Sequence, residues 1–428
     1  MNISVIGVGY VGLCSGLGFA LSGHNTILVN RTQEKADNLN KGISPIYEPG
    51  VEDALKKTIG KSLKASINLE DVVKSSDAIF VCVGTPSRKD GTIDLEDVKK
   101  VSEDIGKVLK KVGGYKIIVV KSTVAPGTTE QVVIPRLEKV SGKKVGKDFG
   151  VCMNPEFLRE GKALDDFLKP DRIVIGEYDK ISGDVLESIY SKFGAKKLRT
   201  GLKTAEMIKY ASNSMLATKI TFVNEVGNIC KLLGIDVYSV MEGVGLDYRI
   251  GPHFLRAGCG FGGSCFPKDV AALVAKAKEV GYNPKLLSDV LEINKKQKVK
   301  MVEMLKEKID VKGKKIAVLG LAFNPDTDDI RESPALDIIT ELLASEAIVV
   351  AYDPVANQNT KALFPDVTYV NSVKEALQGS DACLLVTDWK EFGKLKDTDF
   401  RQMRNKIVIE GRRVLDRNEV SGFEGVCW

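Results

Sequence analysis

Histidine is almost absent from this chain of 428 residues, which contains only His24 and His253. Neither stands in a motif typical of a catalytic base. We therefore exclude a Ser-His-Asp triad and any mechanism built on a histidine base. Proton transfer is expected to fall to carboxylates, lysine or water.

The chain also lacks paired cysteines. Its eight cysteines are scattered without a C-x-x-C pair, which argues against a disulfide framework and against a zinc site made of thiolates. We expect most of them to be small core residues and expect no metal.

Long apolar runs and a strong net charge are absent as well. No stretch reaches membrane-spanning length, and the N-terminus enters an apolar strand without the features of a signal peptide. The net charge of +5 is small beside 62 basic and 57 acidic residues. We expect a cytoplasmic protein with no nucleic-acid or membrane partner, in which local sites bind any anionic ligand.

The residues that are present suit about two or three globular domains, since 43% are hydrophobic and 28% charged. Short β-type runs at 2–6, 26–29, 78–83 and 116–121 alternate with helical patterns, which predicts a parallel sheet with helices on both faces. A second pattern of this kind opens at 314–320 and continues with runs at 347–352, 382–387 and 406–410.

Between these two patterns, residues 202–233 predict an unbroken helix without proline, and a further helix starts near Asp236. We predict an α/β chain with two Rossmann-like doubly wound domains, joined by this long central helix and a further helical region. The expected domains are a dinucleotide-binding domain at 1–200, a central domain at 201–300 and a Rossmann-like domain at 301–428.

A glycine motif follows the first predicted strand. Gly7, Gly9 and Gly12 form G-x-G-x-x-G, with Tyr10 and Val11 inside it, directly after a strand and at the start of a helix. This context lets the backbone approach a pyrophosphate held at the helix N-terminus. A structural role in tight strand-to-helix packing is the alternative, and we favour NAD(P) binding.

The acidic residue expected after the second strand is missing, because the strand ends in Val29-Asn30-Arg31-Thr32. Arg31 and the Thr32 hydroxyl would accommodate the 2′-phosphate of NADP, which a carboxylate would repel. Equally, Asn30 would bind the ribose of NAD while Arg31 remains a solvated charge. Both cofactors stay open, and initial rates with NAD and NADP would decide between them.

Cys265 follows the glycine-rich stretch Phe261-Gly262-Gly263-Ser264 and precedes a helical run that begins near Pro267. The helix dipole and Lys268 both favour a nucleophilic thiolate there. Such a cysteine captures an aldehyde as a thiohemiacetal, which loses a second hydride to become a thioester that water hydrolyses. The alternative is a buried cysteine that only fills space.

Several ordered segments resemble the UDP-glucose/GDP-mannose dehydrogenase family over essentially the whole chain. They are G-x-G-Y-V-G at 7–12, Pro45-Ile46-Tyr47-Glu48-Pro49-Gly50, Val83-Gly84-Thr85-Pro86, Lys121-Ser122-Thr123-Val124, Asn154-Pro155-Glu156-Phe157-Leu158-Arg159-Glu160-Gly161, Ala205-Glu206-Met207-Ile208-Lys209-Tyr210, Gly262-Gly263-Ser264-Cys265 and Asp328-Asp329-Ile330-Arg331-Glu332-Ser333-Pro334. The resemblance implies that the third domain binds a UDP-sugar, and that the central domain is a helical dimerisation region that carries the catalytic cysteine.

The resemblance also implies catalytic roles. Cys265 is then the nucleophile, Lys209 and Asn213 stabilise oxyanions, Asp269 handles protons with a bound water, Thr123 orients water, and Glu160 assists thioester hydrolysis. Lys209 and Asn213 are four residues apart on the predicted long helix and share one face. Cys265 and Asp269 have the same spacing, and so do Glu156 and Glu160 if their segment is helical.

Two further sets of residues are implied by the resemblance. The cofactor set is Gly7, Gly9, Tyr10, Val11, Gly12, Asn30, Arg31, Thr32, Lys35, Gly84, Thr85, Thr123, Glu160, Lys268 and Arg331. The substrate set is Glu156, Phe157, Leu158, Arg159, Lys209, Asn213, Arg249, Phe254, Arg256, Gly262, Cys265, Phe323, Asn324, Arg412 and Arg413.

The sequence resembles the UDP-glucose branch of the family most. Arg249 stands where such enzymes reach the sugar nucleotide of a neighbouring subunit, which implies at least a dimer, and Arg412 and Arg413 follow the last strand as diphosphate or nucleoside contacts. The implied reaction is the NAD(P)-dependent four-electron oxidation of UDP-glucose to UDP-glucuronate. GDP-mannose or another UDP-hexose is the alternative substrate, since the stretches at 84–87 and 141–144 resemble the GDP-mannose enzymes.

One departure concerns Asn324, which replaces a lysine that helps bind the nucleotide sugar in the family. A non-catalytic nucleotide-sugar binding protein is the alternative from another class. The complete set of catalytic residues argues against that alternative.

Overall fold

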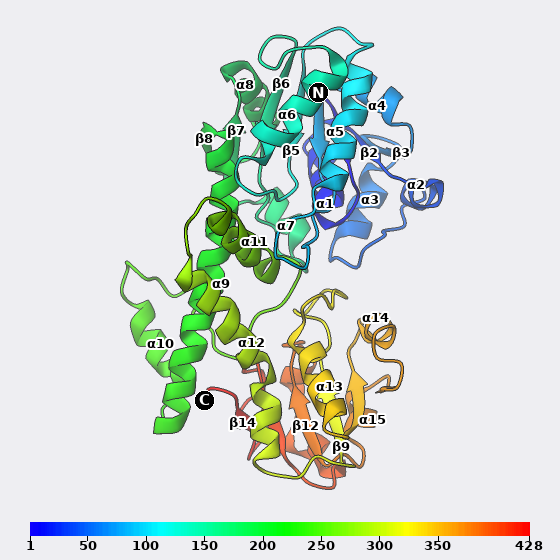
Figure 1. Ribbon diagram of the computed structural model, residues 1–428. Coiled ribbons are helices and arrows are strands. Elements are labelled where there is room, and N and C mark those ends of the chain that lie inside the picture. The colour runs from blue at the N-terminus through cyan, green and yellow to red at the C-terminus, as the bar shows by residue number, and fades with distance from the viewer. The chain divides into compact units, whose positions relative to one another are not determined.

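The computed structural model describes all 428 residues (Figure 1). The chain forms two compact units, Met1–Ser212 and Asn213–Trp428. No helix is both long enough and apolar enough to span a bilayer.

The first unit is built on an eight-stranded sheet with the order β3-β2-β1-β4-β5-β6-β7-β8. The strands are β1 Asn2–Ile6, β2 Asn25–Val29, β3 Leu63–Ser66, β4 Ala78–Val81, β5 Lys116–Val120, β6 Phe149–Met153, β7 Arg172–Glu177 and β8 Lys196–Gly201. All neighbours are parallel except β6 and β7. The strand order reverses between β1 and β4, so ligands are expected beyond the carboxyl ends of these strands.

Helices cover both faces of this sheet (Figure 1). They are α1 Tyr10–Leu21, α2 Gln33–Asn40, α3 Val51–Thr58, α4 Leu69–Ser75, α5 Glu96–Leu109, α6 Ile134–Ser141, α7 Ala163–Leu168 and α8 Lys180–Ile189. Within β4, Ala78 and Phe80 belong to one hydrophobic core and Ile79 and Val81 to another. Successive side chains of a strand point to opposite faces, so a strand buried on both faces reads as one apolar run.

The helices after β8 begin with α9, which spans Leu202–Leu233 as the sequence predicts. The helix predicted near Asp236 is α10, Val237–Gly245, and the Asp236 side chain caps it by accepting from Tyr238 N. Two more helices follow, α11 Phe266–Glu279 and α12 Lys285–Lys306.

The second unit contains a six-stranded parallel sheet with the order β11-β10-β9-β12-β13-β14. Its strands are β9 Lys315–Leu319, β10 Ile348–Tyr352, β11 Thr368–Tyr369, β12 Ala382–Leu385, β13 Val408–Glu410 and β14 Glu424–Gly425. Its helices are α13 Pro334–Ala344, α14 Asn357–Lys361, α15 Val373–Leu377 and the 3-10 helices Phe392–Lys394 and Asp397–Gln402. The predicted fold class, with two doubly wound α/β sheets and a long helix, is confirmed.

Candidate active site

The glycine motif forms the turn between β1 and α1. Gly7 has φ of +95°, and a Cβ at Gly12 would collide with the Gly7 carbonyl oxygen, so both positions require glycine. Gly9 is the N-cap of α1 and has open space around its Cα. No side chain caps α1 and no acidic residue occupies its first turn. This terminus, which begins with Tyr10 and Val11, therefore suits a pyrophosphate.

Asn30 follows β2 and is buried, with its backbone N–H donating to Ser66 O over 2.9 Å. The side-chain Nδ2 has no hydrogen-bond partner in the protein. A buried donor without a partner is costly, and a ribose hydroxyl would satisfy it. The residues at the end of β2 thus fit the adenosine side of a dinucleotide.

Arg31 is 69% exposed and pairs with Asp97 in the first turn of α5, with 2.6 Å between Nη2 and Oδ1. Asp97 could not be found from the sequence, because nothing in the local pattern links residues 31 and 97. Thr32 is the N-cap of α2, and Lys35 lies exposed on that helix. A carboxylate therefore does lie near the end of β2, where the cofactor is expected, but it comes from α5.

Thr85 and Thr123 come together after β4 and β5. The buried Thr85 Oγ1 donates to Thr123 O over 2.8 Å, while Gly84 is exposed. The loop that continues from Thr123 is held by Glu206 of α9, which accepts from Gly127 N at 2.5 Å and Thr129 N at 2.8 Å. Burial raises the pKa of Glu206. The buried Glu206 is a second residue to which the sequence analysis gave no role.

Glu156 and Lys209 form an almost fully buried ion pair, with 2.8 Å between Oε1 and Nζ. Burial on its own raises the pKa of Glu156, but the Lys209 charge and hydrogen bond outweigh it and hold the pKa below its ordinary value. The Phe157 ring lies 5.5 Å from Lys209 Nζ and 3.9 Å from the Arg172 guanidinium. The ammonium of Lys209 is therefore fixed in place inside the first unit.

The segment 154–160 is irregular, so the condition for Glu156 and Glu160 to share a helix face is not met. Pro155 disfavours a helical conformation in the residue before it, and Gly161 has φ of +87°. Glu156 Oε2 accepts from Leu158 N at 2.6 Å, which closes a local turn in place of a helix. Arg159 is exposed and binds Asp166 through its guanidinium, with a shortest distance of 2.6 Å.

Cys265 is the N-cap of α11, and its carbonyl oxygen accepts from Asp269 N over 2.8 Å. The predicted helix start and the one-turn spacing of these two residues are confirmed. Seven of the eight cysteines are buried, and Cys265 alone is partly exposed. Ser264 Oγ lies 3.5 Å from Sγ. The sulfur thus stands at the positive end of a helix and within reach of solvent.

Asp269 is completely buried and holds two partners within the second unit. Its carboxylate accepts from Asn213 Nδ2 at 2.6 Å and from Lys268 Nζ at 2.5 Å. The Lys268 ammonium therefore pairs with Asp269. The N-terminus of α11 is then the local feature that stabilises a thiolate on Cys265. Asn213 keeps one amide hydrogen for another acceptor.

The glycine loop before Cys265 packs against residues 323–332. A Cβ at Gly262 would collide with Glu332 O, and Gly263, with φ of +82°, lies under the Phe323 ring and donates its N–H to Arg331 O. Arg331 is held by Asp329, with both carboxylate oxygens within 2.9 Å of Nε. The neighbouring Asn324 is exposed.

Four arginines of the second unit belong to the substrate set. Arg412 lies beside Gly258, where a Cβ would come within 3.3 Å of its Nη1. Arg413, with φ of +49°, stacks 4.1 Å from the Tyr238 ring. Arg256 lies 5.3 Å from the ring of Phe254, a residue with φ of +64°. The fourth, Arg249, is exposed and bound to Asp247.

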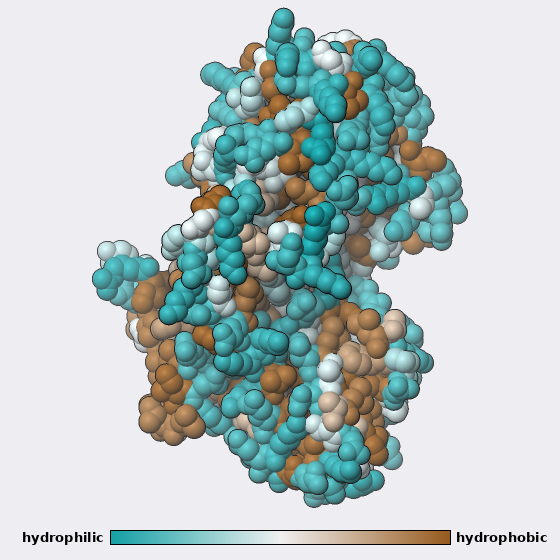
Figure 2. All heavy atoms as spheres, viewed as in Figure 1, coloured by the Kyte–Doolittle hydropathy of each residue, from teal (hydrophilic) through white to brown (hydrophobic).

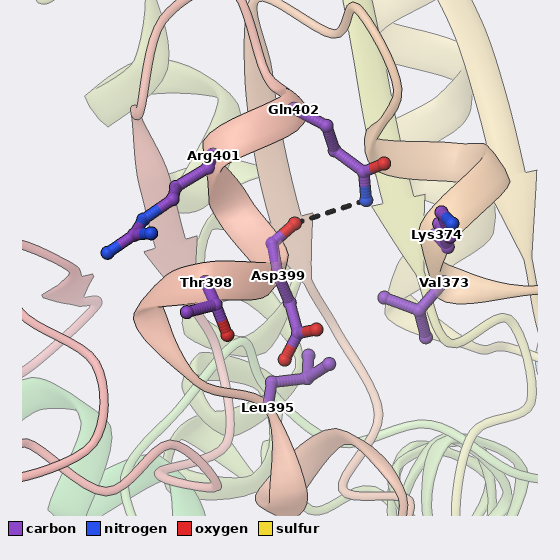
Figure 3. Close-up of a pocket in the computed structure, with 7 residues that line it drawn as sticks. All are labelled: Val373, Lys374, Leu395, Thr398, Asp399, Arg401 and Gln402. Carbon is purple, nitrogen blue, oxygen red and sulfur yellow. Dashed lines mark hydrogen bonds between the residues drawn. The ribbon is translucent and has the colours of Figure 1, made fainter.

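A surface hollow of about 480 Å³ lies between α15 and the 3-10 helix Asp397–Gln402 (Figure 3). Mixed charges line it, and Gln402 Nε2 donates to Asp399 O inside it over 3.1 Å. None of the candidate residues lines this hollow. The candidate site therefore rests on the side-chain geometry described above.

Comparison with known proteins covers nearly the whole chain. Residues 1–194 match the NAD binding domain of the UDP-glucose/GDP-mannose dehydrogenase family, residues 203–296 its central domain and residues 317–417 its UDP binding domain. UDP-glucose 6-dehydrogenases of Haloferax volcanii and Bacillus subtilis are 44% and 43% identical, over 100% and 98% of this chain and 100% and 90% of theirs.

A solved UDP-glucose dehydrogenase from Pyrobaculum islandicum is similar over 100% of this chain and 97% of its own, with 41% identity and a TM-score of 0.94. The resemblance stated from the motifs is thereby confirmed. The chain belongs to the UDP-glucose/GDP-mannose dehydrogenase family.

Proposed function

We propose that this protein oxidises UDP-glucose to UDP-glucuronate with NAD, through a covalent intermediate on Cys265. The observation that carries the proposal is the start of α11, where a partly exposed Cys265 lies one turn from the buried Asp269 and its donors Asn213 and Lys268. The named relatives and the UDP binding domain support UDP-glucose as the substrate. GDP-mannose and other UDP-hexoses are the alternatives that the assay below compares.

Residues of the first unit fit the cofactor. The turn Gly7–Gly12 would hold the pyrophosphate, and the unpartnered Asn30 Nδ2 would donate to a ribose hydroxyl. Bound NAD supplies the hydride acceptor for both oxidation steps.

The remaining chemistry uses side chains of this protein. Cys265 Sγ forms the bond to the aldehyde carbon, giving a thiohemiacetal and then a thioester, and water finally releases the carboxylate and the free thiol. Lys209 and Asn213 donate hydrogen bonds to the developing oxyanions. Asp269 accepts and returns protons with a bound water.

The hydrolytic step needs a positioned water molecule. Thr123 orients it and Glu160 assists its attack on the thioester. The flanking residues Glu156, Phe157, Leu158, Arg159, Gly262, Phe323, Asn324, Arg331, Arg412 and Arg413 complete the substrate and cofactor contacts in this proposal. The division into domains 1–200, 201–300 and 301–428 belongs to the proposal as well and is supported by the three matching family domains.

For the cofactor, we propose that Asp97 keeps NAD preferred over NADP. Its carboxylate neutralises Arg31 and would repel a 2′-phosphate. Asp97→Asn should therefore raise kcat/KM for NADP about tenfold relative to that for NAD. Glu96→Gln removes an equal charge from the same turn without contacting Arg31 and is the matched control. An unchanged NADP to NAD ratio in Asp97→Asn would contradict this role.

For the quaternary structure, we propose a homodimer formed through the exposed face of α9. Met215, Phe222 and Ile229 recur at seven-residue intervals on α9 and are 61%, 53% and 54% exposed. Figure 2 shows apolar side chains gathered over the far end of α9 and over α10. Leu232, near the C-terminus of α9, is 88% exposed. An unpaired apolar stripe of this length suits a second copy of the chain.

The dimer also gives Arg249 a role, since it projects into solvent with Asp247 as its partner and would reach the substrate of the neighbouring subunit. Light scattering should report a dimer for the wild type. Phe222→Asp should reduce it to a monomer, whereas Thr218→Asp in the same helix, at a partly buried position, tests for general disruption. A monomeric wild type would contradict the proposal.

The substrate is tested by a panel of UDP-glucose, UDP-N-acetylhexosamines and GDP-mannose, each with NAD and with NADP. We expect UDP-glucose with NAD to give the highest kcat/KM and two NADH per UDP-glucuronate. Cys265→Ser should not release the carboxylate at the wild-type rate, because a hydroxyl does not form the thioester. Wild-type turnover in that variant would contradict the covalent mechanism.

A further inference from the structure

Glu48 is a buried carboxylate to which the proposed reaction gives no role. It lies in the loop before α3, and only 7% of the residue is exposed. Its Oε2 accepts from Gly161 N at 2.8 Å, and its Oε1 accepts from Ala163 N at 2.7 Å. Both carboxylate oxygens thus bind backbone of a segment more than a hundred residues further along the chain.

That segment carries Glu160, and its residues 154–162 belong to no helix or strand. Its other backbone contacts include Arg159 N, which donates to Asp166 Oδ2 at 2.9 Å, and Lys162 N, which donates to Arg159 O at 2.9 Å. Gly161 directly follows Glu160 and has φ of +87°. Ala163 opens α7, a helix of six residues whose N-cap residue, Lys162, makes no side-chain cap bond. The two bonds from Glu48 satisfy backbone N–H groups on both sides of Lys162 at the start of α7, where no side chain of the N-cap residue does so.

The charges around Glu48 are acidic. Asp165 and Asp166 of α7 lie close enough for their charges to act on Glu48. Burial raises the pKa of the Cys14 thiol of α1, and the charges of Glu48 and Glu160 both act on this thiol and raise its pKa further. Burial, together with these two aspartates, raises the pKa of Glu48 to about 7, although the two backbone bonds favour the ionised form. Below that pH one oxygen carries a proton and becomes a poor acceptor for an N–H that points at it.

We propose that Glu48 is a positioning residue for Glu160, fixing the backbone of residues 161–163 so that the Glu160 carboxylate is placed for thioester hydrolysis. This inference rests on the proposed function, because hydrolysis is the step in which Glu160 acts. The two oxidation steps do not use the Glu160 carboxylate as a base. Loss of Glu48 should therefore slow the last step selectively.

The test is Glu48→Gln, whose amide has one acceptor oxygen and presents an NH₂ group to the other N–H. We expect kcat to fall about 10- to 100-fold, the size typical of a misplaced catalytic group, and KM to fall with it, so that kcat/KM for UDP-glucose and NAD changes little. Stopped-flow mixing should show a burst approaching two NADH per active site before the slow steady state, because the thioester accumulates. Wild-type kcat should rise as the pH increases through about 7, where Glu48 ionises, and this rise should be lost in Glu48→Gln.

Asp179→Asn is the matched control, since Asp179 caps α8 in the same unit by accepting from Ser182 N at 3.0 Å and lies outside the proposed site. It should keep the wild-type rate without a burst. If Glu48→Gln fails to fold, Glu48→Asp keeps the charge with a shorter reach and should show the same burst with a smaller loss. Wild-type kcat, or a slow variant without a burst, would overturn the proposal.

Failure of the proposed function gives a different result. If the wild type does not oxidise UDP-glucose, hydrogen exchange still reports on the contact, because Gly161 and Ala163 amides should exchange faster in Glu48→Gln. If the wild type is active and Glu160→Gln shows no burst, Glu160 is not the group that Glu48 positions, and the inference fails while the overall reaction stands.

Discussion

Replacing Lys209 should leave the buried carboxylate of Glu156 without its ammonium partner. Glu156 and Lys209 are about 95% and 97% shielded from solvent at their side chains, and Glu156 has Leu158 N as its other partner. Lys209→Met fills a similar volume without charge. Breaking a buried ion pair in this way costs about 3 to 5 kcal/mol. For a unit of this size that corresponds to a fall in Tm of roughly 10 °C.

The loss should depend on pH in a defined direction. In the wild type the Glu156 pKa lies below its ordinary value of 4.5, so the pair stabilises the fold above that pH and loses this contribution as the pH falls through the folded pKa. In Lys209→Met, burial still acts to raise the Glu156 pKa, and only Leu158 N and the charge of the buried Lys121 remain to oppose it. The difference in Tm should therefore be largest near neutral pH and shrink in acid.

Scanning calorimetry at several pH values measures this, with Glu156→Gln/Lys209→Met as the control. The double variant contains no buried charge at the pair and should recover most of the lost Tm. A Lys209→Met variant as stable as the wild type at pH 7, or a double variant less stable than the single one, would refute the reasoning.

Other predictions concern backbone contacts. Gly12→Ala should abolish NAD binding in titration calorimetry or prevent folding, because its Cβ would collide with the Gly7 carbonyl oxygen. Glu206→Gln should cost about 2 kcal/mol in unfolding experiments and lower kcat through the loop after β5, since one amide oxygen replaces two acceptors. Asp353→Ala should cost about 3 kcal/mol or more by chemical denaturation, because it leaves four backbone N–H groups and one indole without their acceptor.

Asp353 also marks a difference between the turns that follow the first strand of each sheet. It follows β10 as Asn30 follows β2, and Gly320 shares with Gly7 a φ near +90°. In the second unit, however, Asp353 Oδ2 itself accepts from Leu321 N at 2.7 Å and Ala322 N at 3.0 Å. The protein's own carboxylate thus occupies the donors that a pyrophosphate would need there, although the two sequence patterns are alike.

The sequence by itself determined the features that depend on local pattern. The bounds of α9 and the start of α11 at Cys265 follow from helix-compatible spacing and a Gly-to-Pro boundary, which act over a few neighbouring residues. Apolar runs likewise predicted eight of the fourteen strands, namely β1, β2, β4, β5, β9, β10, β12 and β13. At 154–160 the spacing left the question open, since Glu156 has helical spacing to Glu160 but a proline and a left-handed glycine prevent the helix.

Only the tertiary structure decided which charged groups meet. Glu156 and Lys209 are 53 residues apart, Asn213 and Asp269 are 56 apart, and Glu48 reaches a backbone amide 113 residues away. Nothing in the spacing of such residues encodes their pairing, because it results from the order in which strands and helices pack. Burial then makes each pairing obligatory, since a carboxylate or ammonium removed from water is stable only beside its partner.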